Sequence, residues 1–155
     1  MRRVAPFLAV LALTACGFTP VYGPGGAGTA LQNRVLVEQP DDRTGFLLVQ
    51  RLEERLGRAG DPAYRLAVDL ALREEARAID PDGDIRRFHL IGSAAYTLLL
   101  SGSDSVVQSA TVDNFVSYSA TGTAVATLAA RRDAQERLMV ILADQIVLQL
   151  QGGAL

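Results

Sequence analysis

The ten residues from Tyr64 to Arg73, YRLAVDLALR, alternate strictly between large apolar side chains and small or polar ones. Successive side chains of a β-strand point to opposite faces, so this pattern predicts a strand with one buried face. The predicted buried side chains are Tyr64, Leu66, Val68, Leu70 and Leu72, and the side chains on the opposite face are Arg65, Ala67, Asp69, Ala71 and Arg73.

Three further segments have the composition of strands. A short β-rich run covers Arg34–Glu38, a second long alternating run covers Arg87–Ser101, and a third covers Val106–Tyr118. The sequence DPDGD at Asp80–Asp84 predicts a turn, and Ser101–Asp104 predicts a hairpin turn. Alternation in the last run is weaker, so Asp113 and Asn114 mark either a bulge or the solvent face of that strand.

Two segments have apolar residues at helical spacing. In Asp42–Arg58, Leu48, Leu52 and Leu56 recur every four residues, with Asp42 or Thr44 as the N-cap and with Gly57 and Gly60 at the end. Ala124–Leu150 is predicted to be one long helix, capped by Thr121 or Thr123, whose second half carries a broad apolar face. About 27 residues make a helix of ~40 Å, so its ends are expected either to project from the domain or to fray.

The predicted order of elements is β-α-β-β-β-α. Two helices on one face of a four-stranded, mostly antiparallel sheet form an α+β two-layer sandwich, with the apolar layer between the sheet and the helices.

The N-terminus has the pattern of a bacterial lipoprotein. Two arginines precede an apolar run, Val4–Leu13, which is too short to span a bilayer and is typical of a secretory signal. The run ends in Leu13-Thr14-Ala15-Cys16, which resembles a lipobox, so Cys16 is expected to be the acylated first residue of the mature chain; the alternative is an ordinary leader followed by a buried cysteine. We therefore expect a signal peptide at 1–15, a lipidated Gly- and Pro-rich tether at 16–33, and a single domain at 34–155. Gly17, in place of aspartate, favours the outer membrane.

Composition excludes several classes of function. Without residues 1–15 the formal charge is 13 − 17 = −4, and every basic residue is arginine, so neither nucleic-acid binding nor lysine chemistry is expected. His89 is the only histidine, and no nucleophile elbow accompanies it. Asp80, Asp82 and Asp84 lack the glycine and glutamate spacing of a calcium loop. We expect no catalytic site, no metal and no cofactor.

Two stretches resemble a known family. The sequence CGFTPVYG at 16–23 and the last-helix pattern are similar to the LPS-assembly lipoprotein family, LptE, in its alphaproteobacterial form. The matching helix positions are Arg132, Asp133, Ala134, Arg137, Leu138, Ala143, Ile146 and Leu150. The resemblance implies a lipoprotein anchored in the outer membrane and facing the periplasm. It would plug the lumen of the LPS-assembly β-barrel LptD, help that barrel fold, and help lipopolysaccharide reach the outer leaflet. An accessory lipoprotein of an ABC-type transport system is the alternative.

Within this interpretation, two arginine pairs are candidates for lipopolysaccharide binding: Arg86 with Arg87, and Arg131 with Arg132. Arginine pairs bidentately with phosphate. The alternative is that these arginines are solvated or paired with nearby acids such as Asp82, Asp84 and Asp133. The small and polar outer face of the sheet is the candidate partner surface, with Ala95 and Thr97 at its centre.

Overall fold

The computed structural model describes residues 26–38, 42–79, 85–120 and 122–153. Along these ranges the elements are helix α2 (Ala27–Leu31), strand β1 (Val35–Val37), helix α3 (Arg43–Leu56), strands β2 (Tyr64–Ile79), β3 (Ile85–Leu100) and β4 (Val106–Ser119), and helix α4 (Ala124–Gly152).

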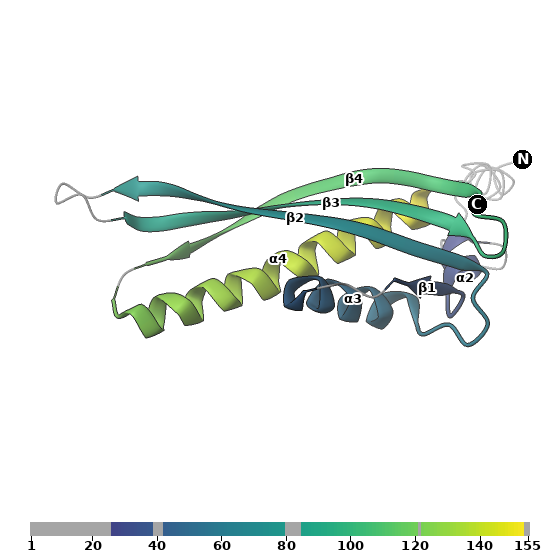
Figure 1. Cartoon of the computed structure of the whole chain (residues 1–155), viewed down its shortest axis with the longest axis horizontal. Helices are drawn as coiled ribbons and strands as arrows, with labels where there is room; N and C mark the ends of the chain where they lie inside the picture. Colours follow the sequence, from purple (N-terminus) through teal and green to yellow (C-terminus); the bar gives the residue numbers. More distant parts are fainter. Residues whose placement is uncertain (1–25, 39–41, 80–84, 121, 154–155) are drawn as a thin grey trace, which may run out of the picture.

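The four strands form one sheet in the order β1-β2-β3-β4. The short strand β1 runs parallel to β2, with Val35 opposite Tyr64, because helix α3 provides the crossover between them. Both other pairings are antiparallel, with Leu66 opposite Leu98 and Ala94 opposite Val112. Helices α3 and α4 pack on one face of this sheet (Figure 1). The predicted two-layer α+β sandwich is therefore confirmed.

The core lies between the helices and the inner face of the sheet. It contains the predicted leucines of α3 and the apolar face of the second half of α4. Gly92 of β3 lies under α4, where a Cβ would be 2.9 Å from Leu142 Cδ1 and 3.1 Å from Leu138 Cδ2. The fully buried large side chains are Tyr96, Leu31, Leu48, Leu52, Leu56, Leu66, Leu98, Leu138, Met139, Leu142, Ile146 and Leu150.

Both long helices begin at residues that the sequence proposed. Asp42 Oδ1 accepts a hydrogen bond from the Gly45 amide at 2.8 Å, and Thr123 Oγ1 accepts one from the Ala126 amide at 3.2 Å. Helix α3 ends at Gly57 as predicted, with φ +76°. These caps satisfy amides that have no partner inside the helix.

The predicted tether is corrected at its C-terminal end. Residues 27–31 form helix α2, and Leu31 is fully buried in the core. The Asn33 amide also donates to the Leu56 carbonyl at 2.7 Å, which joins this segment to the end of α3. The folded part of the chain therefore begins before residue 34.

Strand β2 is also longer than its alternating pattern, by the six residues from Glu74 to Ile79. Glu74, Glu75 and Ala76 have low strand propensity, but they pair with Leu90, His89 and Phe88 of β3. Asp113 and Asn114 do not form a bulge, because they stay in register with Ser93 and Gly92; the β3–β4 irregularity lies at Leu98 and Leu99. The predicted turn at Asp80–Asp84 lies outside the described residues.

The domain is elongated (Figure 1). We call the end that holds α2 and β1 the proximal end, and the end that holds Ile79, Ile85 and the start of α4 the distal end. Helix α4 runs along the whole length, whereas α3 covers only the proximal part of it.

Candidate functional site

The outer face of the sheet, opposite the helices, is built from small and polar side chains. Ala95 lies in register between Asp69 and Thr111, and Thr97 lies between Ala67 and Ser109. Ala95 is exposed and Thr97 is half-buried. Within the described part of the chain no helix packs on this face, and the two predicted residues lie on its central strand β3.

Cations and aromatic rings gather on the distal part of this outer face. Glu75 Oε1 lies 3.7 Å from Arg73 Nη1, and Glu75 Oε2 lies 3.0 Å from Arg77 Nη2. The rings of His89 and Phe115 stack with their centroids 5.0 Å apart, and the Phe115 side chain is 55% exposed. We call Arg73, Glu75, Arg77, Arg87, His89 and Phe115 the distal outer patch. A shallow hollow of about 160 Å³ adjoins it, lined by Ala71, Leu72, Arg73, Ile91, Ser93 and Asp113.

The predicted arginine pairs do not converge on one site. Arg87 is exposed, and strand alternation places it on the outer face with His89. Arg131 instead reaches toward the inner face, where its Nη2 lies 2.8 Å from Glu74 Oε2. Tyr118 also donates its hydroxyl hydrogen bond to Glu74. Arg131 is therefore paired with an acid, as the alternative interpretation expected, but the acid is Glu74 and not Asp133.

The other two predicted arginines differ again. Arg132 is exposed and has no ion pair with any residue in the described ranges. The side chain of Arg86, like Cys16, lies outside what the structure describes. Sequence reasoning missed Arg73, Arg77 and Phe115. The strand alternation offered a signal for Arg73 alone, because Arg77 and Phe115 join the patch only through the pairing of β2, β3 and β4.

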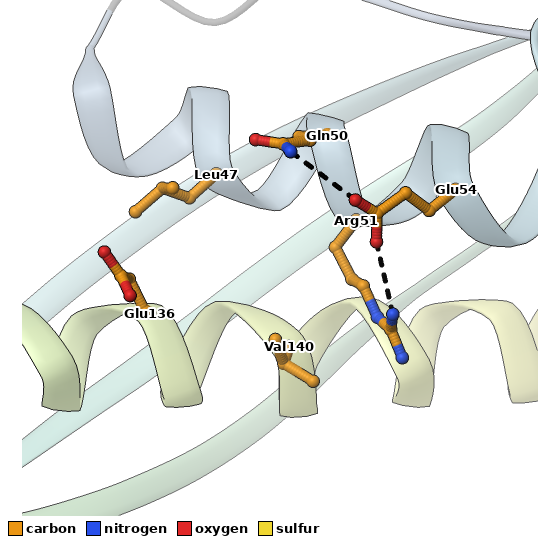
Figure 2. A pocket seen from close by; sticks show the side chains of 6 residues that line it. All are labelled: Leu47, Gln50, Arg51, Glu54, Glu136 and Val140. Carbon is orange, nitrogen blue, oxygen red and sulfur yellow. Dashed lines mark hydrogen bonds and ion pairs between the residues drawn. The ribbon is translucent and has the colours of Figure 1, made fainter.

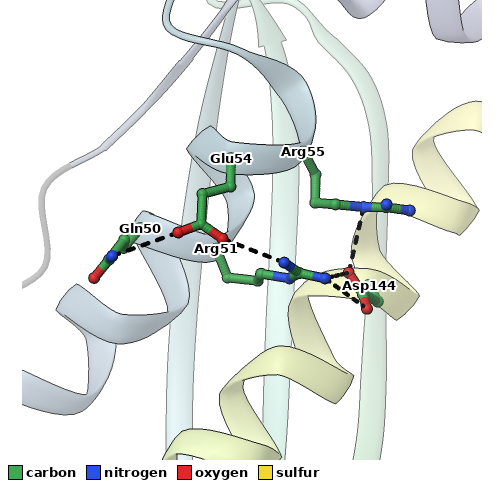
Figure 3. A network of polar contacts seen from close by, with 5 residues as sticks. All are labelled: Gln50, Arg51, Glu54, Arg55 and Asp144. Carbon is green, nitrogen blue, oxygen red and sulfur yellow. Dashed lines mark hydrogen bonds and ion pairs between the residues drawn. The ribbon is translucent and has the colours of Figure 1, made fainter.

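Helices α3 and α4 run side by side and are joined by a polar network (Figure 3). Arg51 Nη2 and Arg55 Nε each lie 3.4 Å from Asp144 Oδ1, and Arg51 also donates to Glu54 at 3.2 Å. The hydrogen bond to Asp144 and then that to Glu54 raise the pKa of Arg51. The network fixes the register between the two helices.

A shallow hollow of about 190 Å³ lies beside this network, between Leu47 and Glu54 on α3 and Glu136 and Val140 on α4 (Figure 2). The hollow is open and partly apolar, and its lining includes the charged side chains of Arg51, Glu54 and Glu136. The described residues contain no group of three His, Cys, Asp or Glu side chains that could hold a metal ion. None of the helices within those ranges is both long and apolar enough to cross a membrane.

Comparison with known proteins supports the sequence interpretation. The family model described as LptE, lipopolysaccharide-assembly, matches residues 32–150. The chain belongs to the LptE family. The LptE match begins at the end of α2 and stops just before the end of α4, so it covers all four strands and both long helices. No curated protein matches the sequence.

Several solved structures share the fold of this LptE chain. A protein from Caulobacter crescentus, described as a lipoprotein, is 29% identical with a TM-score of 0.70, over 84% of this chain and 96% of that one. The rare lipoprotein B from Shewanella oneidensis is 18% identical, with a TM-score of 0.56 over 75% and 89% of the two chains. Lipoprotein B from Nitrosomonas europaea is 14% identical, with a TM-score of 0.61 over 88% and 91%.

Proposed function

We propose that this LptE-family chain is an outer-membrane lipoprotein that partners and plugs the LPS-assembly β-barrel, LptD. In this role it helps the barrel assemble and helps lipopolysaccharide pass to the outer leaflet, and it catalyses no reaction. The observation that carries the proposal is the family match across all four strands and both long helices.

The form of the domain suits this role. The lumen of a large outer-membrane barrel is polar, and the outer sheet face is an uncovered surface of small and polar side chains. Acylation at Cys16 would hold the domain at the periplasmic side of the outer membrane. Gly26 lies ten positions after Cys16, which at ~3.3 Å per residue gives a reach of at most about 33 Å. Such confinement raises the effective concentration of the domain at the barrel.

We further propose that lipopolysaccharide contacts the distal outer patch through Arg87, with Arg86 beside it in the sequence. The patch holds three guanidinium groups and one carboxylate, Glu75, which lies 3.7 Å from Arg73 and 3.0 Å from Arg77. Lipopolysaccharide phosphates and acidic sugars favour such donors, and charge-assisted bonds to them are the strong ones. Arg131 is a weaker candidate, because its guanidinium is held by Glu74.

The experiment that tests the partner is a pull-down of the tagged, lipidated chain from detergent-solubilised outer membranes of its native host. A large barrel protein in about equal amount is expected, because one domain would plug one barrel. If an inner-membrane ATPase complex copurifies instead, the chain is an accessory subunit of a transporter and the plug proposal is wrong.

The lipopolysaccharide site is tested on the same purified chain by the salt-sensitive binding of lipopolysaccharide. Replacing Arg87 and Arg73 with alanine should weaken binding about tenfold, because two charge-assisted contacts are lost. Arg58→Ala is the matched control, since this arginine is 84% exposed and lies at the end of α3, away from the patch. Equal binding by all three proteins would contradict the site.

A further inference from the structure

Helix α4 carries a second uncovered surface, on the helix layer. In its proximal half, Leu138 and Leu142 contact the sheet at Gly92, while Glu136, Val140 and Asp144 lie beside α3. At 3.6 residues per turn, the buried side chains of Met139, Leu142, Ala143, Ile146 and Val147 lie on the helix face between these two directions. We call this face of α4 the seam.

Helix α3 covers only part of the seam. It begins at Arg43, whose guanidinium lies 4.0 Å from Glu136, and it runs from there toward Asp144. The twelve residues from Ala124 to Gln135 precede that contact, which at 1.5 Å per residue leaves about 18 Å of α4 beyond α3. Figure 1 shows this part of α4 extending beyond α3 toward the distal end. Between Ala124 and Asp133 no side chain is buried.

The uncovered part of the seam has the side chains of a packing surface. Val125, Leu128 and Ala129 precede Met139, Leu142 and Ala143 by fourteen residues (139 − 125 = 14), which is two heptads and returns nearly the same helix face. Val125 is 78% exposed and Leu128 is 48% exposed. Ala129 is a small residue between these larger apolar ones, which allows a neighbouring backbone to approach closely.

Arg132 lies on the same face, one turn after Leu128 and Ala129. Its neighbours are paired, Arg131 with Glu74 at 2.8 Å and Arg137 with Asp133 at 2.9 Å, but Arg132 has no ion pair in the described ranges. An occupant of the seam would therefore meet an apolar strip that ends in an available guanidinium. Charge complementarity requires a carboxylate on the occupant.

A second copy of the chain does not fit this surface. Two helices crossing along about 18 Å bury far less than the ~1,200 Å² that a stable interface needs, so the seam is one part of a larger contact. A partner that surrounds the domain provides such a contact.

We propose that Val125, Leu128, Ala129 and Arg132 receive an apolar segment of the barrel protein that carries a carboxylate opposite Arg132. This rests on the proposed plug function and adds a defined contact on the helix layer. The partner would then hold the domain from both sides, through the outer sheet face and through the seam.

The test compares two substitutions on one helix, Leu128→Asp and Leu148→Asp, in the lipidated chain. Leu148 is 70% exposed but lies in the proximal half of α4, away from the seam. Leu128→Asp should reduce the copurified barrel about tenfold or more, as loss of an interface anchor does, while Leu148→Asp should change it less than about twofold. Arg132→Glu should reduce the copurified barrel as Leu128→Asp does, whereas Arg132→Lys should retain most of the binding.

A photo-crosslinking residue at position 128 tests the contact without destabilising it. We expect a covalent product with the barrel protein, and the linked peptide should contain Asp or Glu. If the wild-type chain copurifies the barrel while Leu128→Asp binds equally well and position 128 gives no product, the seam proposal is wrong and the plug function stands. If the wild-type chain captures no barrel, the plug function itself fails.

Discussion

Gly57 shows how a single residue joins the N-terminal segment to helix α3. It ends the helix with φ +76°, and an added Cβ would lie 2.0 Å from Asn33 Oδ1. Gly57→Ala should therefore lower the free energy of unfolding by about 1–2 kcal/mol or more, because alanine disfavours this backbone conformation and also displaces Asn33. Urea denaturation of the purified protein in detergent, followed by circular dichroism, measures the change.

The control is Gly60→Ala, three residues later, where an added Cβ meets nothing within 4 Å. That variant should match the wild type. Equal stability of Gly57→Ala and Gly60→Ala would mean that Asn33 does not pack closely against Gly57.

Tyr96 makes the stability of the fold depend on pH in the alkaline range. The Tyr96 hydroxyl donates to Gln149 Oε1 at 3.0 Å and accepts from Gln108 at 2.9 Å, and the side chain is 1% exposed. Burial raises the pKa of Tyr96 above 10, with the Gln108 hydrogen bond opposing the shift. The stability from this raised pKa is present below the unfolded pKa near 10 and is lost as pH rises through the folded pKa.

The melting temperature should therefore fall as pH rises from 9 to above ~10, and Tyr96→Phe should flatten that fall. At pH 8 the Phe variant should itself be about 1 kcal/mol less stable, because Gln108 and Gln149 lose a partner. Thermal melts at a series of pH values compare the two proteins. The assignment to Tyr96 is wrong if both lose stability along the same alkaline curve.

At the scale of elements, the packing of α4 on the sheet depends on Gly92. A valine there would push into Leu138, Leu142 and Leu72, whose side-chain atoms lie 2.9–3.2 Å from an added Cβ. Gly92→Val should cost about 1–3 kcal/mol of unfolding free energy, as overpacking does. Ser93→Val, one residue later on the open outer face, should change it by less than about 0.5 kcal/mol. Similar losses in the two variants would contradict this assignment of faces.

The elements that the sequence predicted well are those set by local patterns. Alternation identified β2 and β3, leucine spacing identified α3, and both observed N-caps were among the residues proposed. The parts that it missed depend on distant contacts. Helix α2 is short and rich in small residues, and Leu31 is buried only because the rest of the core exists. Residues Glu74–Ile79 are a strand because β3 pairs with them.

The candidate site shows the same division. The sequence analysis grouped arginines that are adjacent in the chain. In the structure, Arg87 lies on the outer face of the sheet, whereas Arg131 pairs with Glu74 on the inner face. The distal outer patch instead combines side chains that are up to about forty residues apart, Arg73 on β2 and Phe115 on β4 (115 − 73 = 42). No local pattern could join them before the strand register was known.

At the scale of the whole molecule, the helices of the described residues form one layer on one face of the sheet, and none of them covers the other face. The open face has alanine, serine and threonine at its centre, which lets a partner's backbone or solvent approach closely. We expect that face to meet the wall of the barrel. The small side chain of Ala95 is then important for the contact with the barrel and not for the core. Its neighbours Asp69 and Thr111 are exposed, so a larger side chain at position 95 would not disturb the core.

Ala95→Arg and Thr97→Arg should therefore weaken copurification of the barrel while changing the melting temperature of the isolated domain by less than about 2 °C, since neither side chain faces the core. Ala95→Ser keeps the side chain small and is the matched control, expected to bind like the wild type. Quantitative copurification from outer membranes and thermal melts of the same preparations measure both effects. A complex that survives Ala95→Arg and Thr97→Arg together would place the barrel contact elsewhere, and a large fall in melting temperature would place these residues in the packing of the sheet.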